Sequence, residues 1–496
     1  MLLKVKSLKL FAGRPVAIIH KKKAKQLNVH VDERVMVKSK RKRIITLIDT
    51  IATALLDEGE IVLSEEVINE LKLRTGQYIE IIPVEQPESA YYIREKIKGK
   101  ELNDKKIFSI ISDIVSNKLT EAEIAYFISA VYINRMNMNE IFSLIKAIVN
   151  TGKKLNIKGK TIIADKHCIG GIAGNRTTPI VVSICAAAGL TMPKTSSRAI
   201  TSAAGTADVM ETITNVEFSV KQIKKIIKKV NACMVWGGAL GLAPADDKII
   251  QVERLLSLDP EAQLIASILS KKVSAGATHV VLDIPCGKSA KFSEEEGGEL
   301  GKKFEYLASK LGIKLKVYIS NGSEPIGNGI GPVLEIKDVI AILSRQENRP
   351  RDLEKKSVKL AALLLELTNK VPRGKGIEKA NQILDSGSAY RKFNEIIKAQ
   401  NNSLNNIESL LRVGKYSCEI LAKKSGRIVG IDNKKINAIA RIAGCPADKG
   451  SGLYLWKHCN DNIKANDKIL TIYSEIKEKL EYAKKKYIYL DPIEIA

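Results

Sequence analysis

The chain has 496 residues, of which 45% are hydrophobic and 27% charged, as is typical of a globular protein with a large core. A chain of this length is expected to hold about three domains. No apolar run reaches the roughly 18 residues needed to cross a bilayer. The N-terminus alternates apolar and charged residues like a strand, unlike a signal peptide. We therefore expect no membrane association and a cytoplasmic location.

The formal net charge is +25, which raises the question of nucleic-acid binding. The basic residues are spread along amphipathic segments such as 221–229 and 477–486, and aromatic residues make up only 5% of the chain. Side chains that could stack on single-stranded bases are therefore scarce. We interpret the charge as a solvated, lysine-rich surface that also attracts anionic substrates, and we predict no nucleic-acid partner.

The seven cysteines form no CxxC pair, and the five histidines do not cluster. This pattern predicts reduced cysteines without a disulfide framework, and it provides no zinc site. We expect neither a metal nor a cofactor.

The first part of the chain, 1–86, is rich in short β segments separated by turns, with one helix over 65–73 that Ser64 can cap. This pattern predicts a small barrel-like domain. Residues 87–158 are expected to be helical. A capping box at 120–123 starts one helix, and Asn137 caps the next. Part of the stretch 205–255 is expected to join this helical domain.

Residues 159–415 alternate strands and helices, which predicts an α/β domain. The expected strands lie at 160–164, 279–284 and 314–320, and a Lys-, Asn- and Ser-rich segment near 399–405 is expected to form a loop. Residues 416–496 return to short strands and turns, which predicts an α+β C-terminal domain.

Two glycine- and hydroxyl-rich loops lie about thirty residues apart in the α/β domain. The first follows the strand at 160–164 and runs through Lys166 to Gly171, with a helix expected from Thr177. Paired glycines let backbone N–H groups approach an anion, and the helix N-terminus favours negative charge. The second loop carries Ser196, Ser197, Arg198, Thr201 and Ser202, and Thr206 is a candidate N-cap. One such loop would be an ordinary strand–helix turn, but two together favour an anionic ligand.

Further candidates lie in two later segments. Asp259-Pro260 is expected to start a helix on which Ser267 and Lys271, four residues apart, share a face. For Asp259 alone, a structural N-cap is the better interpretation. The loop at 285–291 follows a strand at its carboxyl end and contains Lys288 and Lys291, although it lacks the P-loop spacing.

Taken together, these motifs resemble the thymidine phosphorylase/AMP phosphorylase family. The similarity rests on Lys-His-Cys-x-Gly-Gly at 166–171, Ser-Arg followed by Gly-Thr-x-Asp-x-x-Glu at 197–211, Ala-Pro-Ala-Asp at 243–246 and Ser-Ile-Leu-x-Lys-Lys at 267–272. The extra N-terminal domain resembles the archaeal AMP phosphorylase branch. That branch is implied to be a pentosyltransferase that converts AMP, CMP or UMP and inorganic phosphate to the free base and ribose 1,5-bisphosphate.

The resemblance also implies a role for individual residues. Asp259 would protonate the departing base, and Cys168 stands where the family has a serine, which puts one phosphate contact in doubt. Lys166, Ser196 and Thr206 would hold inorganic phosphate. The nucleotide would be bound by Gly171, Ser197, Arg198, Ala199, Ile200, Thr201, Ser202, Thr206, Ser267 and Lys291.

Three alternatives remain open at this stage. The first is a pyrimidine-nucleoside phosphorylase that prefers uridine or thymidine. The second is a phosphoribosyltransferase of related fold, which would need Mg²⁺, and the third is a basic protein that binds nucleic acid. The resemblance implies a homodimer and, for archaeal members, a larger homo-oligomer.

Overall fold

The computed structural model describes residues 1–496 except 41, 54, 200–201 and 402–409. The chain divides into two compact units, one formed by Met1–Gly152 with Ala243–Ser270 and the other by Lys153–Leu242 with Lys271–Ala496. Among the described residues, no helix is both long enough and apolar enough to cross a membrane. The expected loop near 399–405 falls largely outside the described residues.

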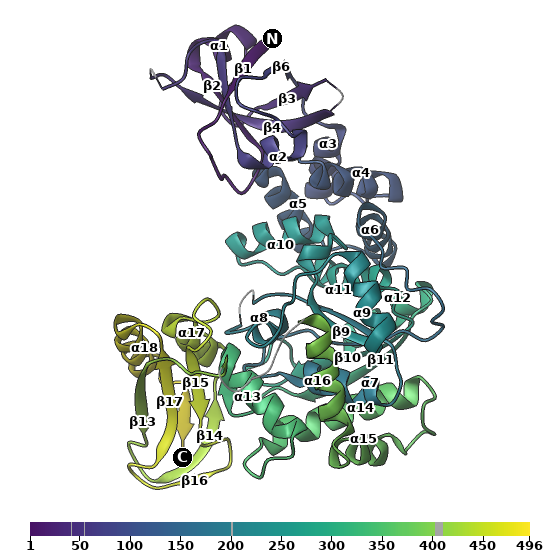
Figure 1. The fold of residues 1–496 in the computed structure, drawn as a ribbon, viewed down its shortest axis with the longest axis vertical. Helices are drawn as coiled ribbons and strands as arrows, with labels where there is room; N and C mark the ends of the chain where they lie inside the picture. Colours follow the sequence, from purple (N-terminus) through teal and green to yellow (C-terminus); the bar gives the residue numbers. More distant parts are fainter. Residues whose placement is uncertain (41, 54, 200–201, 402–409) are drawn as a thin grey trace. The chain divides into compact units, whose positions relative to one another are not determined.

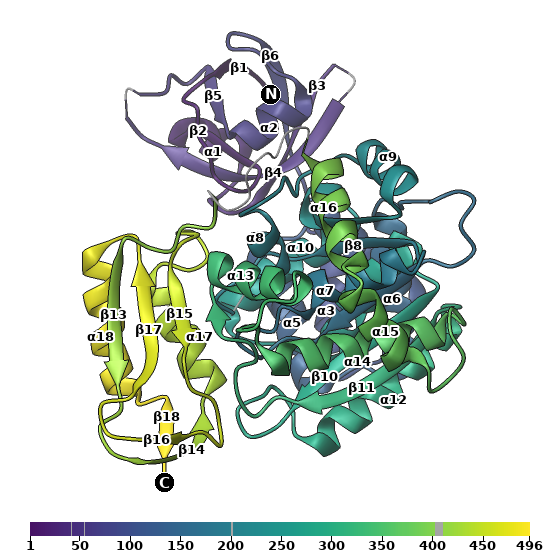
Figure 2. The same cartoon turned by 60° about the horizontal axis from the view of Figure 1, so that its bottom comes forward.

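The N-terminal strands form a closed barrel in the order β1-β5-β2-β4-β3-β6 (Figures 1 and 2). Alternation gives each strand one buried face, so that in β1 Leu3 and Val5 are buried whereas Lys4 is exposed. The predicted helix after Ser64 is present, but the Ser64 hydroxyl donates to the Arg14 carbonyl and does not cap it. The elements are β1 (Leu2–Lys6), β2 (Val16–His20), α1 (Lys21–Leu27), β3 (Arg34–Ser39), β4 (Lys42–Ile51), β5 (Glu60–Leu63), α2 (Glu65–Leu71) and β6 (Tyr78–Pro83).

Helices follow the barrel in the same unit. The predicted capping box at Thr120 and Glu123 is confirmed at the start of α5. The predicted cap Asn137 is also confirmed at the start of α6, where it forms a second capping box with Glu140. Of the stretch 205–255, residues 243–255 lie in this unit and 205–242 in the other. The helices are α3 (Glu88–Ile97), α4 (Asp104–Val115), α5 (Glu121–Asn134), α6 (Met138–Thr151), α10 (Pro244–Leu256) and, across the unit boundary, α11 (Glu261–Ala275).

The α/β domain is built on parallel strands in the orders β11-β10-β7 and β8-β9, and a parallel bridge from Ile163 to Thr191 joins the two groups. The expected strands at 279–284 and 314–320 are confirmed as β10 and β11, and the expected helix from Thr177 as α7. The elements are β7 (Ala164–Cys168), α7 (Thr177–Ala187), β8 (Met192–Ser196), α8 (Thr206–Met210), α9 (Val220–Val230), β9 (Ala232–Trp236), η1 (Gly238–Leu240), β10 (His279–Cys286), α12 (Glu294–Lys310), β11 (Lys314–Asn321), α13 (Pro332–Leu343), α14 (Arg351–Leu367), α15 (Gly376–Asp385) and α16 (Ser388–Gln400).

The strand expected at 160–164 is displaced along the chain. Strand β7 begins at Ala164 and includes Asp165, Lys166 and His167, which the sequence analysis placed in a loop. The apolar run ahead of it misled the prediction, because charged residues rarely enter a buried strand. Asp165 does so here because the buried Lys194 and Lys272 pair with it, and Lys166 does so with a hydrogen bond to Thr177, as described below.

The C-terminal domain consists of antiparallel strands covered by α17 and α18. One of its strands, β12, comes from the glycine-rich segment at 327–331 of the α/β domain and pairs with β15. The two domains therefore share a sheet within one unit. The elements are β12 (Gly329–Ile330), β13 (Tyr416–Leu421), β14 (Gly426–Ile431), α17 (Asn433–Ala443), β15 (Gly452–Leu455), β16 (Asn462–Ile463), β17 (Lys468–Ser474), α18 (Lys477–Leu490) and β18 (Ile493–Ile495).

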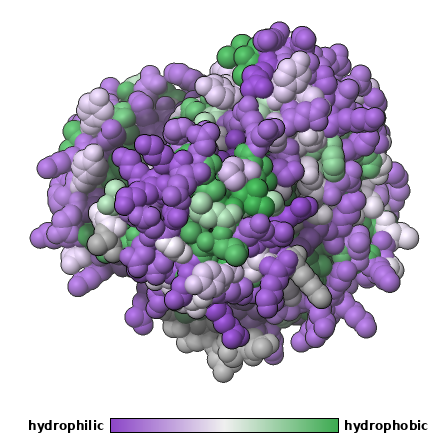
Figure 3. Space-filling model, turned by 90° about the horizontal axis from the view of Figure 1, so that it is seen from above, coloured by the Kyte–Doolittle hydropathy of each residue, from purple (hydrophilic) through white to green (hydrophobic). Residues whose placement is uncertain are grey.

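The surface is dominated by hydrophilic side chains in the view of Figure 3, with a hydrophobic patch near the centre of that face. Helix α9 shows how this surface arises. Its lysines lie on the exposed side, whereas Ile223, Ile226 and Ile227 are buried. This distribution is what the interpretation of the net charge as a solvated surface expects.

Candidate active site

Lys166 is fixed at the N-terminus of α7. It is buried in β7, and its Nζ donates a hydrogen bond to Thr177 Oγ1 at 2.6 Å. Thr177 is the first residue of α7, whose 11 residues direct a favourable dipole at any anion bound there. Burial lowers the pKa of Lys166 to about 8, so the ammonium stays charged at neutral pH. A buried cation at a helix N-terminus is suited to phosphate.

A buried ion cluster lies next to Lys166 along the sheet. Asp165 accepts from Lys194 Nζ at 3.0 Å and from Lys272 Nζ at 2.6 Å, and Lys194 also donates to the Lys166 carbonyl at 2.8 Å. Burial opposes ionisation of Asp165, but the two lysines hold its pKa below the usual value. The sequence analysis missed this cluster, since no local pattern links residues 165, 194 and 272.

The first loop contains the cysteine that departs from the family pattern. Cys168 Sγ accepts from Asn175 Nδ2 at 3.3 Å and from the Gly170 N–H at 3.5 Å. Burial raises the pKa of Cys168 to about 11, so the thiol is neutral and only a weak donor. Because the Thr177 oxygen already accepts from Lys166, its hydroxyl proton is left to be donated elsewhere. Thr177 is thus placed to supply a hydroxyl that Cys168 lacks.

The first loop packs against the segment that carries Lys291. Gly170 and Gly171 adopt φ angles of +87° and +92°, which disfavour other residues. A Cβ on Gly171 would lie 3.3 Å from Lys291 Cβ and 3.4 Å from Lys291 N. The backbone of Lys291 therefore contacts Gly171, so two residues assigned to the nucleotide lie side by side.

Asp208 organises the second loop. Its Oδ2 accepts from the N–H groups of Ala199 and Gly205 at 2.7 and 2.9 Å. Gly205 is the N-cap of α8 and Thr206 its first residue, so the expectation that Thr206 caps the helix is wrong. The Asp208 carboxylate binds the N–H of the N-cap residue Gly205, and Thr206 Oγ1 has another partner, as described below.

Other hydroxyls of the second loop bond within the loop or to the neighbouring strand. Ser196 Oγ donates to the Val235 carbonyl at 3.3 Å, and Ser202 Oγ donates to the Ala204 carbonyl at 3.0 Å. Ser197 is exposed. Ile200 and Thr201 lie outside the described residues, so their assigned roles stay predictions.

Arg198 is held by carboxylates. Its two terminal nitrogens contact both oxygens of Glu211 at 2.8 and 2.6 Å, and the guanidinium lies 4.6 Å from the centre of the Trp236 ring. The Arg198 hydrogen bond lowers the pKa of Glu211 to about 2. This geometry shapes the loop and half-buries Arg198 at its edge.

Arg176 joins the two loops, although the sequence analysis did not select it. From the first loop, its Nη1 donates to Thr206 Oγ1 at 2.7 Å and its Nη2 to the Ala204 carbonyl at 2.9 Å. Its Nε donates to buried Glu335 at 2.6 Å. With its oxygen occupied by Arg176, the Thr206 hydroxyl has its proton available for an anion. A basic residue inside a glycine-rich loop was the signal that could have identified Arg176.

The selected residues fall into different units. The residues Lys166, Gly171, Ser196–Ala199, Ser202, Thr206 and Lys291 belong to the unit formed by Lys153–Leu242 and Lys271–Ala496. Asp259 and Ser267 belong to the other unit, where α11 begins at Glu261, directly after Asp259-Pro260. The structure thus brings the phosphate loops and Lys291 together, whereas the roles of Asp259 and Ser267 rest on sequence.

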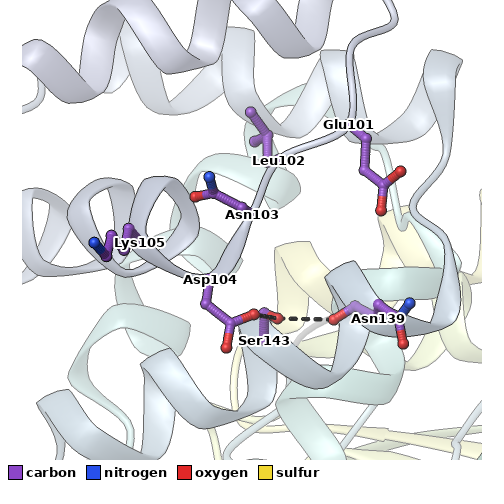
Figure 4. Close-up of a pocket in the computed structure, with 7 residues that line it drawn as sticks. All are labelled: Glu101, Leu102, Asn103, Asp104, Lys105, Asn139 and Ser143. Carbon is purple, nitrogen blue, oxygen red and sulfur yellow. Dashed lines mark hydrogen bonds between the residues drawn. The ribbon is translucent and has the colours of Figure 1, made fainter.

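A cavity of about 480 Å³ lies elsewhere, among the starts of α4 and α6 (Figure 4). In it the Ser143 hydroxyl contacts the Asp104 carboxylate and donates to the Asn139 carbonyl at 2.8 Å. The lining combines Glu101, Asp104 and small polar residues with a single lysine, Lys105. This cavity is therefore much less suited to bind an anion than the two glycine-rich loops are.

Comparison with known proteins decides the family. Residues 90–152 match the helical bundle domain of the glycosyl transferase family, 160–390 its a/b domain, and 428–489 the pyrimidine nucleoside phosphorylase C-terminal domain. A Pyrococcus furiosus protein named AMP phosphorylase is 42% identical over 99% of this chain and 97% of its own. The chain belongs to the thymidine phosphorylase/AMP phosphorylase family.

The chain is also similar to one further relative and to one solved structure. A Legionella pneumophila protein named "Putative thymidine phosphorylase" is 40% identical over 91% of this chain and 87% of its own. The structure of anthranilate phosphoribosyltransferase from Thermus thermophilus covers 62% of this chain and 98% of its own, with a TM-score of 0.53 and 17% identity. That likeness shows a shared fold only.

Proposed function

We propose that this protein is an AMP phosphorylase, which cleaves AMP with inorganic phosphate to give adenine and ribose 1,5-bisphosphate in nucleotide degradation. The observation that carries the proposal is the contact between Gly171 and Lys291 beside the first loop. It places the backbone of Lys291, whose side chain carries a second positive charge, beside the loop that suits inorganic phosphate. A nucleoside 5′-monophosphate needs such a cation, whereas a nucleoside does not.

Inorganic phosphate is the proposed nucleophile. Lys166, Ser196 and Thr206 hold it, with Thr177 as a further donor from α7. The buried lysines around Asp165 add positive potential that needs no reorganisation during the reaction. The bound phosphate oxygen attacks C1′ of the ribose while the N-glycosidic bond breaks through an oxocarbenium-like state.

The remaining assigned residues bind the nucleotide and the leaving base. Gly171, the 197–202 run, Thr206, Ser267 and Lys291 bind AMP, and Asp259 protonates the base as it leaves. A carboxyl near a helix N-terminus ordinarily has a lowered pKa, because the helix dipole favours the anion. Asp259 therefore needs desolvation or nearby phosphate charge to hold a proton.

CMP and UMP are proposed as further substrates, because the assigned contacts fix the sugar and its phosphate more than the base. From the family resemblance we also propose a cytoplasmic homodimer that assembles into a larger homo-oligomer.

The second candidate is a pyrimidine-nucleoside phosphorylase, which the similarity to the Legionella pneumophila protein favours. That enzyme would release uracil from uridine or thymine from thymidine. It would gain nothing from Lys291 as a partner for a 5′-phosphate.

The test is a product analysis with purified protein, AMP and inorganic phosphate. Adenine is followed by chromatography, and the sugar product by its two distinct phosphorus resonances in ³¹P NMR. A reaction without added phosphate is the control. Ribose 1,5-bisphosphate that forms only with phosphate is the expected result. Adenine accompanied by ribose 5-phosphate would indicate hydrolysis and contradict the proposal.

A further inference from the structure

Helix α17 of the C-terminal domain bonds to both phosphate loops. Asn433 Oδ1 accepts from the Ala173 N–H of the first loop at 3.0 Å, and Asn437 Oδ1 accepts from the Ala203 N–H of the second at 2.9 Å. The two asparagines are four residues apart, so they share one face of the helix. In Figures 1 and 2 this helix lies on the side of its domain toward α8 and α13.

Each loop also inserts an apolar group into the C-terminal domain. Ala173 and Ala203, each 1% exposed, belong to the same hydrophobic cluster as Ile436, Ile439 and Leu453 of that domain. The two loops are therefore held in the same way. In each loop an alanine buries its methyl group in the C-terminal domain, and the N–H of the same alanine donates to an asparagine of α17.

Asn433 reaches a third loop as well. Its Nδ2 donates to Ser289 Oγ at 2.8 Å and to the Gly322 carbonyl at 3.1 Å. Ser289 lies two residues before Lys291, and its hydroxyl in turn donates to the Ser323 carbonyl. One fully buried side chain thus connects the first phosphate loop with the segment that carries Lys291.

We propose that α17 sets the spacing of the three substrate loops, with Asn433 and Asn437 as positioning residues for phosphate and AMP. The inference rests on the proposed function. Its physical basis is the burial of the donors and acceptors, because a buried N–H that loses its acceptor finds no water to replace it. A loop released from α17 moves its phosphate donors away from their productive positions, and small displacements are costly in catalysis.

The first test uses Asn437→Leu, which keeps the side-chain size but removes the acceptor, and Asn437→Asp, which keeps the acceptor. Asn437→Leu is expected to raise the KM for inorganic phosphate roughly tenfold, with a smaller change in kcat. Amide hydrogen exchange of peptides covering the second loop should become faster. Asn437→Asp is expected to restore most of both properties.

Asn433→Asp separates the two functions of Asn433. The carboxylate still accepts from the Ala173 N–H, but it cannot donate to Ser289 or Gly322. The KM for AMP should therefore rise more than the KM for phosphate. Exchange should increase in peptides covering 287–291 more than in those covering 168–176.

Ser474→Ala is the matched control, because the Ser474 hydroxyl donates to the Ala443 carbonyl at 2.6 Å inside the same domain and has no bond to the described residues of the three loops. It should lower the melting temperature without changing either KM. If Asn437→Leu behaves like Ser474→Ala, with a lower melting temperature and unchanged KM and loop exchange, α17 is only a structural support and the inference is wrong. Absence of wild-type activity on AMP would instead contradict the proposed function, and the exchange measurements would still test the inference.

Discussion

Lys166 combines three properties that rarely occur in one side chain, namely burial, a positive charge and a position at a helix N-terminus. The motif around it was visible in the sequence, and the family resemblance assigned it to phosphate. Its hydrogen bond to Thr177 was not, because the strand was expected to end before Lys166. The chemistry of a residue can thus be predicted from a motif, whereas its partners depend on where the strand begins.

A pH dependence follows for Lys166. Its pKa is lowered to about 8 by burial, so the free enzyme loses this positive charge as the pH rises through that value. Since phosphate binds the charged form, kcat/KM for phosphate should fall above about pH 8, whereas kcat should fall less because bound phosphate keeps the ammonium charged. Lys166→Arg keeps the charge at every accessible pH. Whatever activity this variant retains should therefore no longer show the fall in kcat/KM for phosphate above about pH 8. If the fall in kcat/KM above about pH 8 persists in Lys166→Arg, the titrating group is not Lys166.

Lys291→Ala should raise the KM for AMP strongly. A charge-assisted hydrogen bond to the 5′-phosphate is worth a factor of roughly 10 to 100 in affinity. Activity on adenosine, if the enzyme accepts it, should change little. The matched control is Lys288→Ala, since Lys288 lies in the same loop and makes an exposed ion pair with Glu494 at 3.8 Å. Losses of equal size for AMP and adenosine would contradict the 5′-phosphate assignment.

Asp259→Asn should lower kcat by about 10²- to 10⁴-fold, because adenine is a poor leaving group unless it is protonated. The KM for AMP should change little, since the amide keeps the size of the carboxyl group. Steady-state kinetics at saturating phosphate measure both parameters. An unchanged kcat would remove Asp259 from the role of proton donor and leave it as the structural residue before α11.

At the scale of elements, the prediction succeeded where local rules decide the structure. The capping box at Thr120 and the cap at Asn137 were confirmed, as were α7, β10 and β11, because each is set by residues close together in sequence. Strand β7 was misplaced because its buried Asp165 is paired with Lys194 and Lys272, which no local window contains. The contacts of α17 with both loops join residues more than 200 positions apart, so they had no local signal either.

Asp165→Asn tests the ion cluster that allows β7 its charged sequence. Removing the carboxylate leaves Lys194 and Lys272 buried without their counter-charge, which should destabilise the fold by about 3–5 kcal/mol. Burial lowers the pKa of Lys272 to about 7 even in the intact cluster. In the variant that pKa should fall further, so the loss should be largest at acidic pH and shrink as rising pH neutralises Lys272.

Urea unfolding at several pH values measures this loss of stability. Asp104→Asn is the control, because its carboxylate pairs with Lys146 at 3.4 Å on the surface, where ion pairs contribute little. Equal stability changes in the two variants would show that the buried cluster does not support β7.

At the scale of the whole molecule, composition and pattern predicted a multidomain α/β protein with an all-α domain and a distinct C-terminal domain. The family matches agree with that description. The sequence did not reveal that β12 of the α/β domain pairs with β15 of the C-terminal domain. The pairing depends on the glycine-rich segment, where a Cβ on Gly329 would lie 2.4 Å from the Leu334 backbone. The close approach at Gly329 is a tertiary property that the glycines permit but do not specify.

The lysines of this chain fall into an exposed group and a buried group. Most of its positive charge is solvated, as on α9, whereas Lys166, Lys194 and Lys272 are buried at one place beside the phosphate loops. The buried lysines are proposed to contribute to phosphate binding, whereas the surface charges act only through long-range attraction that salt screens.

The most direct measurement of the central claim is the phosphate-dependent release of adenine from AMP, made in parallel with the release of uracil from uridine by the same purified protein. We expect a kcat/KM for AMP that exceeds the value for uridine by at least about a factor of ten, since uridine lacks the 5′-phosphate that Lys291 is proposed to bind. Release of uracil from uridine without release of adenine from AMP would contradict the account and make the protein a nucleoside phosphorylase.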